Sequence, residues 1–282
     1  MTPLSGTRLF LGVLLAAGAW APARSEALAA KLRPETVRAF ERMVRETEPD
    51  LERRARTGGE FLVFETDAEA RRRARSGEVV IVKLRPPKVK VPHGKAHYWG
   101  GILFDPDRSA EDYLKLLLDY QRHQDYYSDV LRSELISHEG NRYHSRLRLY
   151  KKKVLSATLN TDFETVVLHP RPDTIFLKSI ATRIAEVAEP DTPEEHERPV
   201  GEDSGFLWRQ NSYWRLVDAD GGVYVELITL SLSRDIPTGL GWVVGPFVNS
   251  IPKETLESML STTRRVLRDN VRAKQRAGAA NL

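Results

Sequence analysis

Residues 221–234 read GGVYVELITLSLSR, and residues 252–271 read PKETLESMLSTTRRVLRDNV. The first stretch is a Gly-Gly turn followed by a long, mostly apolar run, which predicts a β-strand over residues 223–233. The second stretch predicts a helix, because its apolar residues recur at the spacing of one buried helix face. Residues 238–247, between the two, are rich in glycine and predict a loop. A strand followed by a long amphipathic helix indicates an α+β domain in which a sheet covers the C-terminal helix.

The segment 1–23 predicts a cleavable signal peptide. Arg8 precedes an apolar run over residues 9–20, and the small residues Ala21 and Ala23 occupy the positions that a signal peptidase reads. The apolar run is too short to span a membrane comfortably. We therefore expect cleavage after Ala23 and a periplasmic or secreted protein.

The amino-acid composition excludes several kinds of site. The chain has 282 residues and no cysteine, which excludes a lipoprotein anchor, a disulfide framework and a thiolate metal site. Its 43 Lys and Arg nearly balance its 39 Asp and Glu, with basic clusters at 53–56, 71–75, 151–153 and 264–276. No nucleic-acid motif accompanies these clusters, so we expect no nucleic-acid partner. Two interpretations stay open: solvated helix faces, or transient contact with an anionic membrane surface.

The chain divides into three parts after the signal peptide. Residues 24–76 predict an N-terminal helical appendage, with a helix over 33–56 that Pro49 interrupts and too few apolar residues for a core of its own. Residues 78–270 form the main domain, and the basic tail 271–282 is expected to be disordered. Within the appendage, the sequence also predicts a short strand at 61–64 and a charged helix at 67–75. The main domain has a predicted helix after Ser109 and a polar loop at 189–204. Its predicted strands are 79–84, 96–104, 130–138, 143–150, 154–159, 163–168, 174–187, 205–217 and 223–233.

This order of elements resembles the helix-grip fold of START-like proteins, the SRPBCC superfamily that also holds polyketide cyclases and coenzyme Q-binding START proteins. Local phrases resemble an exported bacterial branch of it: 99–104, Asp119-Tyr120 with Tyr127 and Val130, 179–187, 206–209, 212–215 and 231–237. The resemblance implies a curved antiparallel sheet wrapped around the C-terminal helix. It also implies a cavity between sheet and helix that takes lipids, sterols, quinones or polyketides.

Strand periodicity gives candidates for the lining of such a cavity. Tyr224, Glu226, Ile228 and Leu230 fall on one face of the strand 223–233. With Trp208 and Trp214 they predict an aromatic pocket or, as the alternative, side chains that fill the core under the helix. Arg209 and Arg215 fall opposite the tryptophans, which favours the solvent face. The full set of predicted ligand-binding residues is Trp99, Tyr127, Trp208, Trp214, Tyr224, Glu226, Ile228, Leu230, Trp242, Phe247 and Met259, with Arg183 and Arg234 as candidates for a polar headgroup.

Catalytic and metal-binding motifs are missing from the sequence. There is no Gly-x-Ser-x-Gly elbow, and the pairs His93/His97 and Asp119/His123 do not complete a zinc site. We expect no cofactor, no metal ion and no catalytic residue. The leading hypothesis is an exported binding protein for a hydrophobic small molecule or lipid. The alternatives are a cyclase-type enzyme that uses a cavity Glu or His, such as Glu226 or His144, as acid or base, and an envelope interaction module without a pocket.

Overall fold

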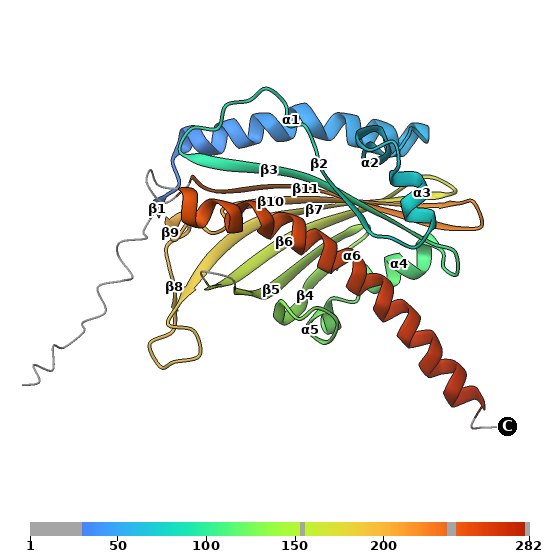
Figure 1. Ribbon diagram of the computed structural model, residues 1–282. Helices are drawn as coiled ribbons and strands as arrows, with labels where there is room; N and C mark the ends of the chain where they lie inside the picture. The colour runs from blue at the N-terminus through green and yellow to red at the C-terminus, as the bar shows by residue number, and fades with distance from the viewer. Residues whose placement is uncertain (1–29, 153–155, 236–240, 280–282) are drawn as a thin grey trace, which may run out of the picture.

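The structure of the protein, a computed structural model, describes residues 30–152, 156–235 and 241–279 (Figure 1). Within the last helix it describes the side chains of residues 250–269. The predicted signal peptide, residues 1–23, lies outside the described residues. No helix in these ranges is long and apolar enough to cross a membrane.

A nine-stranded antiparallel sheet forms the centre of the molecule. Its strands are β2 (Val80–Lys83), β3 (Gly94–Asp105), β4 (Val130–Glu139), β5 (Arg142–Lys152), β6 (Ser156–Arg171), β7 (Thr174–Ala188), β8 (His196–Glu197), β10 (Arg209–Ala219) and β11 (Gly222–Arg234). They follow the order β2-β3-β11-β10-β7-β6-β5-β4, and the short β8 pairs with β7. Strands β1 (Ala30–Lys31) and β9 (Glu202–Asp203) form a separate pair.

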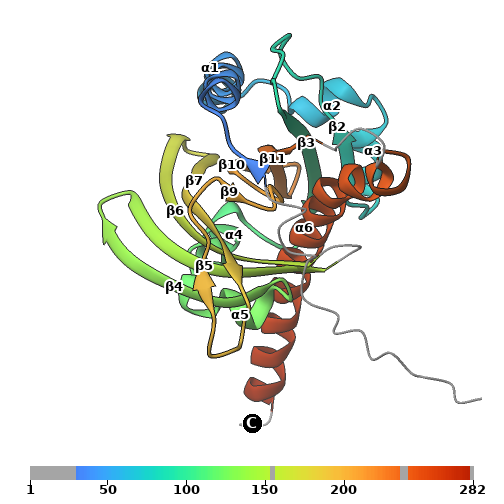
Figure 2. The ribbon, with the colours of Figure 1, turned by 90° about the vertical axis from the view of Figure 1, so that its left-hand side faces the viewer.

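Helices lie on both faces of this sheet. They are α1 (Pro34–Thr57), α2 (Leu62–Thr66), α3 (Ala70–Arg75), α4 (Ala110–Leu117), the 3-10 helix η2 (Tyr120–Arg122), α5 (His123–Tyr126) and α6 (Gly241–Ala279). Figures 1 and 2 show α1 on one side of the curved sheet and α6 across the other. We call the side of α1 the convex face and the side of α6 the concave face. The predicted fold class, an α+β helix-grip fold with a curved sheet around the C-terminal helix and an N-terminal helical appendage, is confirmed.

Two adjacent glycines in β3 allow helices to approach the sheet from both sides. A Cβ atom on Gly101 would lie 2.6 Å from Cδ1 of Leu260 in α6. A Cβ atom on Gly100 would lie 3.0 Å from a methyl group of Val63 in α2. Only glycine avoids both contacts, because it has no side chain. Strand β3 therefore packs closely against α6 on the concave face and α2 on the convex face.

Helix α6 is longer than the sequence predicts. The predicted loop over 238–247 and helix start at Pro252 are wrong for the described residues, because α6 begins at Gly241. Proline is most common in the first turn of a helix, so the sequence pattern places the start of the helix at Pro252. In the structure Pro252 lies inside α6. The helix also continues to Ala279, where the sequence predicts a disordered tail from residue 271. Alanine, arginine, lysine and glutamine in that tail all have high helix propensity.

Helices α1, α2 and α3 are the described part of the N-terminal appendage. Helix α1 continues through Pro49 without interruption and ends at Thr57. The next residue, Gly58, has a left-handed φ of 70°, which suits glycine. The predicted strand over 61–64 is wrong, because this segment leads into α2. A short apolar run does not distinguish a strand from a buried helix by its periodicity.

The appendage and the sheet share one hydrophobic core. The core joins buried side chains of α1, α2 and β11, among them Phe40, Met43, Leu51, Val63, Phe64, Tyr224, Ile228 and Leu230. The ring of Tyr224 lies 4.7 Å from that of Phe104 and 5.4 Å from that of Phe61, centroid to centroid. The centre of the sheet is therefore buried on both faces.

One long strand, β6, replaces the two strands predicted at 154–159 and 163–168. Its register against β7 shifts between Asp162 and Phe163, but the strand continues. Asp162 is tolerated there because its carboxylate accepts a 2.6 Å hydrogen bond from Nε of Arg146 on the neighbouring strand. The polar loop 189–204 contains β8 and β9, which tie it to β7 and β1.

A capping box starts α4 after Ser109, where the sequence predicts a helix. Ser109 Oγ accepts a hydrogen bond from Asp112 N at 3.3 Å, and Asp112 Oδ2 accepts one from Ser109 N at 3.1 Å. Replacing Ser109 by alanine is expected to lower the free energy of unfolding by about 1 kcal/mol, measured by urea denaturation. Ser137→Ala, at an exposed position on β4, is the control; equal losses in the two variants would contradict a capping role.

Strand β4 is the last strand on one side of the sheet. Its pairing with β5 is interrupted twice, between Val130 and Arg132 and between Leu135 and Ser137. Each interruption leaves one residue of β4 without a register partner and bends the strand locally. The outermost strand on the other side, β2, is only four residues long.

Candidate ligand-binding site

A cavity of about 500 Å³ lies between the concave face of the sheet and α6. Small-molecule pockets in proteins typically measure roughly 300–1,000 Å³. The apolar part of its lining comes from both walls: Leu147, Leu149, Leu159, Phe163, Leu177 and Trp214 from the sheet, and Ile251, Leu256 and Met259 from α6. A ligand in this cavity is thus covered by apolar side chains on two sides.

The periodicity of each element explains which side chains reach the cavity. On β5, Ser145, Leu147 and Leu149 are two residues apart and share the concave face. On α6, Thr255 and Met259 are four residues apart and share one helix face. The sheet and the helix therefore each present one regular face to the same space.

Four of the residues predicted to bind the ligand line this cavity: Tyr127, Trp214, Met259 and Arg234. The phenol oxygen of Tyr127 lies 2.9 Å from Oγ1 of Thr263, which connects the end of α5 to α6. Burial raises the pKa of Tyr127 to about 12. Contact of these four side chains with a ligand stays a prediction.

Four others, Tyr224, Glu226, Ile228 and Leu230, face away from the cavity, contrary to the prediction. They share one face of β11, as the strand period predicts, but it is the convex face beneath α1 and α2. Strand β11 is buried on both faces, so its sequence pattern does not show which face is concave. The concave face of β11 instead carries Thr229.

Two more of the predicted tryptophans, Trp99 and Trp208, also lie outside the cavity lining. Trp99 packs against the core beneath α6. Trp208 precedes the first residue of β10, so strand alternation does not apply to it, and its indole N–H donates to Asp203 at 2.9 Å. The side chains of Trp242 and Phe247 lie outside the described residues.

The arginines of the sheet also differ from their predicted places. Arg183, a predicted headgroup contact, pairs with Glu197 of β8 and is 37% exposed. Arg215 lies opposite Trp214, as predicted, yet it is only 5% exposed because α1 and α2 cover the convex face. The expectation of a solvent-exposed Arg215 is wrong, since the sequence gives no sign that a helical layer covers this face.

Small hydroxyl residues are the part of the lining that the sequence analysis missed. Serine and threonine are mostly exposed in proteins, so in a strand pattern they indicate a solvent face. A usable signal exists in β11, where residues 229, 231 and 233 alternate with apolar residues. The hydroxyl residues that line the cavity from the strands β5, β6, β7, β10 and β11 are Ser145, Ser156, Thr165, Ser179, Ser212, Thr229, Ser231 and Ser233.

Two buried histidines line the cavity as well. His97 on β3 has a ring nitrogen 3.2 Å from Oγ of Ser233, and burial lowers its pKa to about 4. His123 on α5 is 7% exposed, and burial lowers its pKa too. Its Nε2 atom has no hydrogen-bond partner in the described ranges. A neutral imidazole offers one donor and one acceptor to a ligand.

Charged side chains line the cavity at the end where β7 and β11 finish. Glu186 accepts a 3.1 Å hydrogen bond from Ser204 N and lies 3.4 Å from Nε of Arg198. Arg234 and Asp235 lie at the same end. In the part of the chain that the structure describes, no group of three or more His, Asp or Glu side chains could hold a metal ion.

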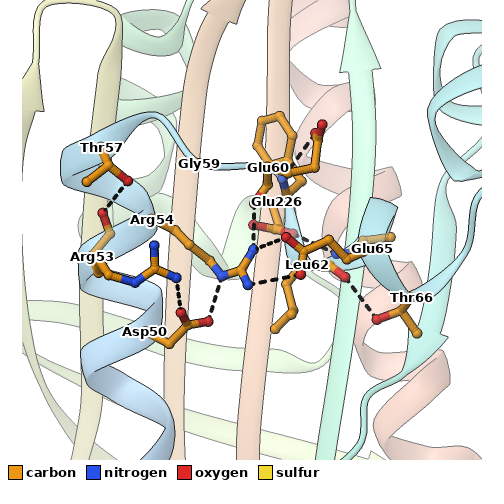
Figure 3. Close-up of polar contacts among 12 residues, drawn as sticks. Asp50, Arg53, Arg54, Thr57, Gly59, Glu60, Leu62, Glu65, Thr66 and Glu226 are labelled. Atoms are coloured by element: carbon orange, nitrogen blue, oxygen red, sulfur yellow. Dashed lines mark hydrogen bonds and ion pairs between the residues drawn. The ribbon is translucent and has the colours of Figure 1, made fainter.

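A second group of charged residues lies on the convex face, away from the cavity. Figure 3 shows Arg54 of α1 between Asp50 and Glu65, with nitrogen–oxygen distances of 2.6 Å to each carboxylate. Glu226 accepts a 3.0 Å hydrogen bond from the N–H of Val63, at the start of α2. Burial raises the pKa of Glu226 to about 7. These contacts connect α1 and α2 to each other and to β11.

Comparisons with known proteins add fold-level similarity only. No family model matches the sequence, and no curated protein matches it. A STAR-related lipid transfer protein from Xanthomonas axonopodis is 18% identical, with 67% of this chain and 98% of that chain covered and a TM-score of 0.43. The Zhui aromatase/cyclase from Streptomyces sp. R1128 is 13% identical (64% and 98% covered, TM-score 0.42), and human STARD10 is 11% identical (71% and 80% covered, TM-score 0.39). In this chain a curved antiparallel sheet wraps around α6, and its strands follow the order given above. This is the START-like helix-grip fold that the sequence resemblance predicts.

Proposed function

We propose that this protein is an exported binding protein that holds one hydrophobic small molecule, such as a lipid, an isoprenoid or a quinone, between the sheet and α6. The observation that carries the proposal is the cavity of about 500 Å³ with apolar side chains on both walls. An apolar cavity of this size gives affinity through buried area, and a few polar groups in it orient the ligand. Export rests on the predicted signal peptide, and cell fractionation tests it separately.

Neither of the two residues named for the acid–base alternative lines the cavity. Glu226 lies on the convex face, bonded to Val63 N. His144 is next to the inward Ser145 on β5, so it points outward, and its side chain is 43% exposed near Glu164. A general acid or base must be within hydrogen-bond reach of the substrate. The cavity therefore supports binding without these two residues in a catalytic role.

Native mass spectrometry of the mature protein tests the proposal directly. The protein is expressed with its signal peptide, purified without detergent, and extracted with organic solvent to identify a bound compound. We expect one lipid-like or isoprenoid molecule per chain. An empty protein that also fails to take up a fluorescent fatty acid or sterol would overturn the proposal.

A substitution that fills the cavity gives a second test. Leu149→Trp places a larger side chain into the lining from β5. We expect ligand affinity to fall by at least about tenfold, which corresponds to about 1.4 kcal/mol. Leu131→Trp, at a position on β4 that is 47% exposed, is the matched control and should bind as the parent does. Unchanged binding by a folded Leu149→Trp variant would place the ligand elsewhere.

A further inference from the structure

Four hydroxyl residues form a row across the concave face of the sheet. Thr165 of β6 is the register partner of Ser179 of β7, Ser179 that of Ser212 of β10, and Ser212 that of Thr229 of β11. All four line the cavity. We call them the hydroxyl row. Because neighbouring strands lie about 4.8 Å apart, the row extends for roughly 14 Å across the cavity floor.

The hydroxyl row keeps hydrogen-bonding capacity that the protein does not use. Thr165 Oγ1 donates to Ser179 Oγ at 2.9 Å, and Gln210 Nε2 donates weakly to Ser212 Oγ at 3.4 Å. Each hydroxyl has one donor and two acceptor positions, so these two bonds leave most of the capacity open. A ligand with oxygen atoms along one edge would pair with several of these hydroxyls.

Two unpaired polar groups adjoin the β6 end of the hydroxyl row. Ser145 of β5 lines the cavity and is 2% exposed, and its Oγ makes no hydrogen bond of ordinary length within the described residues. The phenol of Tyr120, which also lines the cavity, interacts with the hydroxyls of Ser145 and Thr165. His123, whose Nε2 is also unpaired within the described residues, lines the same cavity. Its ring lies 5.0 Å from that of Tyr120, centroid to centroid. Buried polar groups are normally paired, so these two atoms are open to a polar group of a ligand in the cavity.

The surroundings of the hydroxyl row are neutral. The charged residues that line the cavity from the strands β5, β7 and β11 lie further along them, toward one end of the cavity. Glu186 is seven residues beyond Ser179 on β7, Lys151 six beyond Ser145 on β5 and Arg234 five beyond Thr229 on β11, which corresponds to roughly 17–23 Å. Leu256 and Met259 of α6 line the wall opposite the sheet. A carboxylate over the row would be buried without a cationic partner, which is unfavourable. A molecule with a neutral polar edge and an apolar edge fits both walls.

We infer that the cavity selects a neutral apolar molecule with hydroxyl or carbonyl oxygens along one edge, which the hydroxyl row and Ser145 bind, over a hydrocarbon or a carboxylate of the same size. This inference rests on the proposed function and narrows its ligand class. It favours oxygenated ring systems over free fatty acids.

The test compares three probes with the same skeleton of three fused rings: 1,8-dihydroxyanthraquinone, anthracene and anthraquinone-2-carboxylate. Binding is followed by quenching of tryptophan fluorescence, since Trp214 lines the cavity. We expect the dihydroxyanthraquinone to bind at least about tenfold more tightly than either other probe. Equal affinity for all three, or a preference for the carboxylate, would overturn this inference and leave the proposed function intact. A preference for anthracene, or binding of none of the three by the folded protein, would also overturn this inference. The proposed function is overturned only if the protein is also empty in native mass spectrometry and takes up neither a fluorescent fatty acid nor a sterol.

Variants of the row show whether the hydroxyls cause the preference. Thr165→Val with Thr229→Val removes two hydroxyls and keeps their shape, so we expect the preference to fall to about threefold or less. Thr158→Val is the matched control, because Thr158 lies on β6, is 4% exposed and does not line the cavity. A preference retained in the double variant would contradict the inference. Should the double variant not fold, Thr229→Val alone, at a half-buried position, serves the same comparison.

Discussion

Replacing Arg215 by methionine is expected to lower the free energy of unfolding by about 2–4 kcal/mol, because a buried carbonyl loses a charged donor and a ring loses a cation contact. The guanidinium is buried, donates to the backbone carbonyls of Gly59 and Glu60, and lies 4.4 Å from the centre of the Phe61 ring. Its register partner on β11 is Glu226. Methionine fills similar space, but it leaves the Gly59 carbonyl without its side-chain donor and removes the nearby positive charge from the Glu226 carboxyl group. The Glu60 carbonyl keeps its 2.9 Å hydrogen bond from Arg54.

Urea unfolding at pH 7, followed by circular dichroism, measures this loss. Arg183→Met is the control, because it removes an arginine from a partly exposed ion pair with Glu197. Exposed ion pairs contribute about 0–1 kcal/mol, so the control should change little. Equal, small losses in both variants would show that Arg215 does not hold the segment between α1 and α2 on the sheet.

The pH dependence of stability is expected to change when Glu226 is replaced by glutamine. The pKa of Glu226 is raised to about 7, first by burial, while the N–H of Val63 and the charges of Arg215 and Arg54 oppose the rise. Unfolding returns the group to its ordinary pKa of 4.5. Between these values the folded state holds a proton that the unfolded state has released. The stabilisation is therefore complete below pH 4.5 and is lost as the pH rises to 7, by about 3 kcal/mol in total.

The measured quantity is the difference in unfolding free energy between the parent and Glu226→Gln, from pH 4 to 8. The difference is needed because His97, whose pKa is lowered to about 4, titrates in the opposite sense in both proteins. Glutamine keeps an oxygen that can accept from Val63 N. Relative to the variant, the parent should lose stability between pH 4.5 and 7 and then stay level. Parallel pH profiles would contradict a protonated, buried Glu226; Glu139→Gln, at an exposed position on β4, is the control.

The fold was predictable because its main signals are local. The apolar spacing of Leu256 and Leu260 identifies the C-terminal helix, and both side chains are buried against the sheet. Alternation likewise places Tyr224 and Glu226 on one face of β11. The direction of that face depends on α1 and α2, which are more than a hundred residues away in the sequence. No local pattern carries such information, so the predicted lining was reversed at this strand.

The predicted residues that line the cavity are large side chains that stand out in their segments. Trp214 and Tyr127 are aromatic, Met259 lies on the apolar face of α6, and Arg234 is a charge at the end of a strand. Ser179 and Ser212 are ordinary residues, and their importance comes from their register across β7 and β10. Register is set by the long-range pairing of strands, and a single strand sequence does not contain it.

The interrupted pairing of β4 affects how this protein behaves among copies of itself. An open sheet presents unpaired backbone groups at its outer strands, where a second molecule can add a strand and start aggregation. Here the two bulges of β4 break the regular ladder that such an addition requires, and β2 at the opposite side is too short to template one. Closure into a barrel would remove these edges altogether. Because both edges are already poor templates for an added strand, the sheet can stay open around α6 and leave room for a ligand.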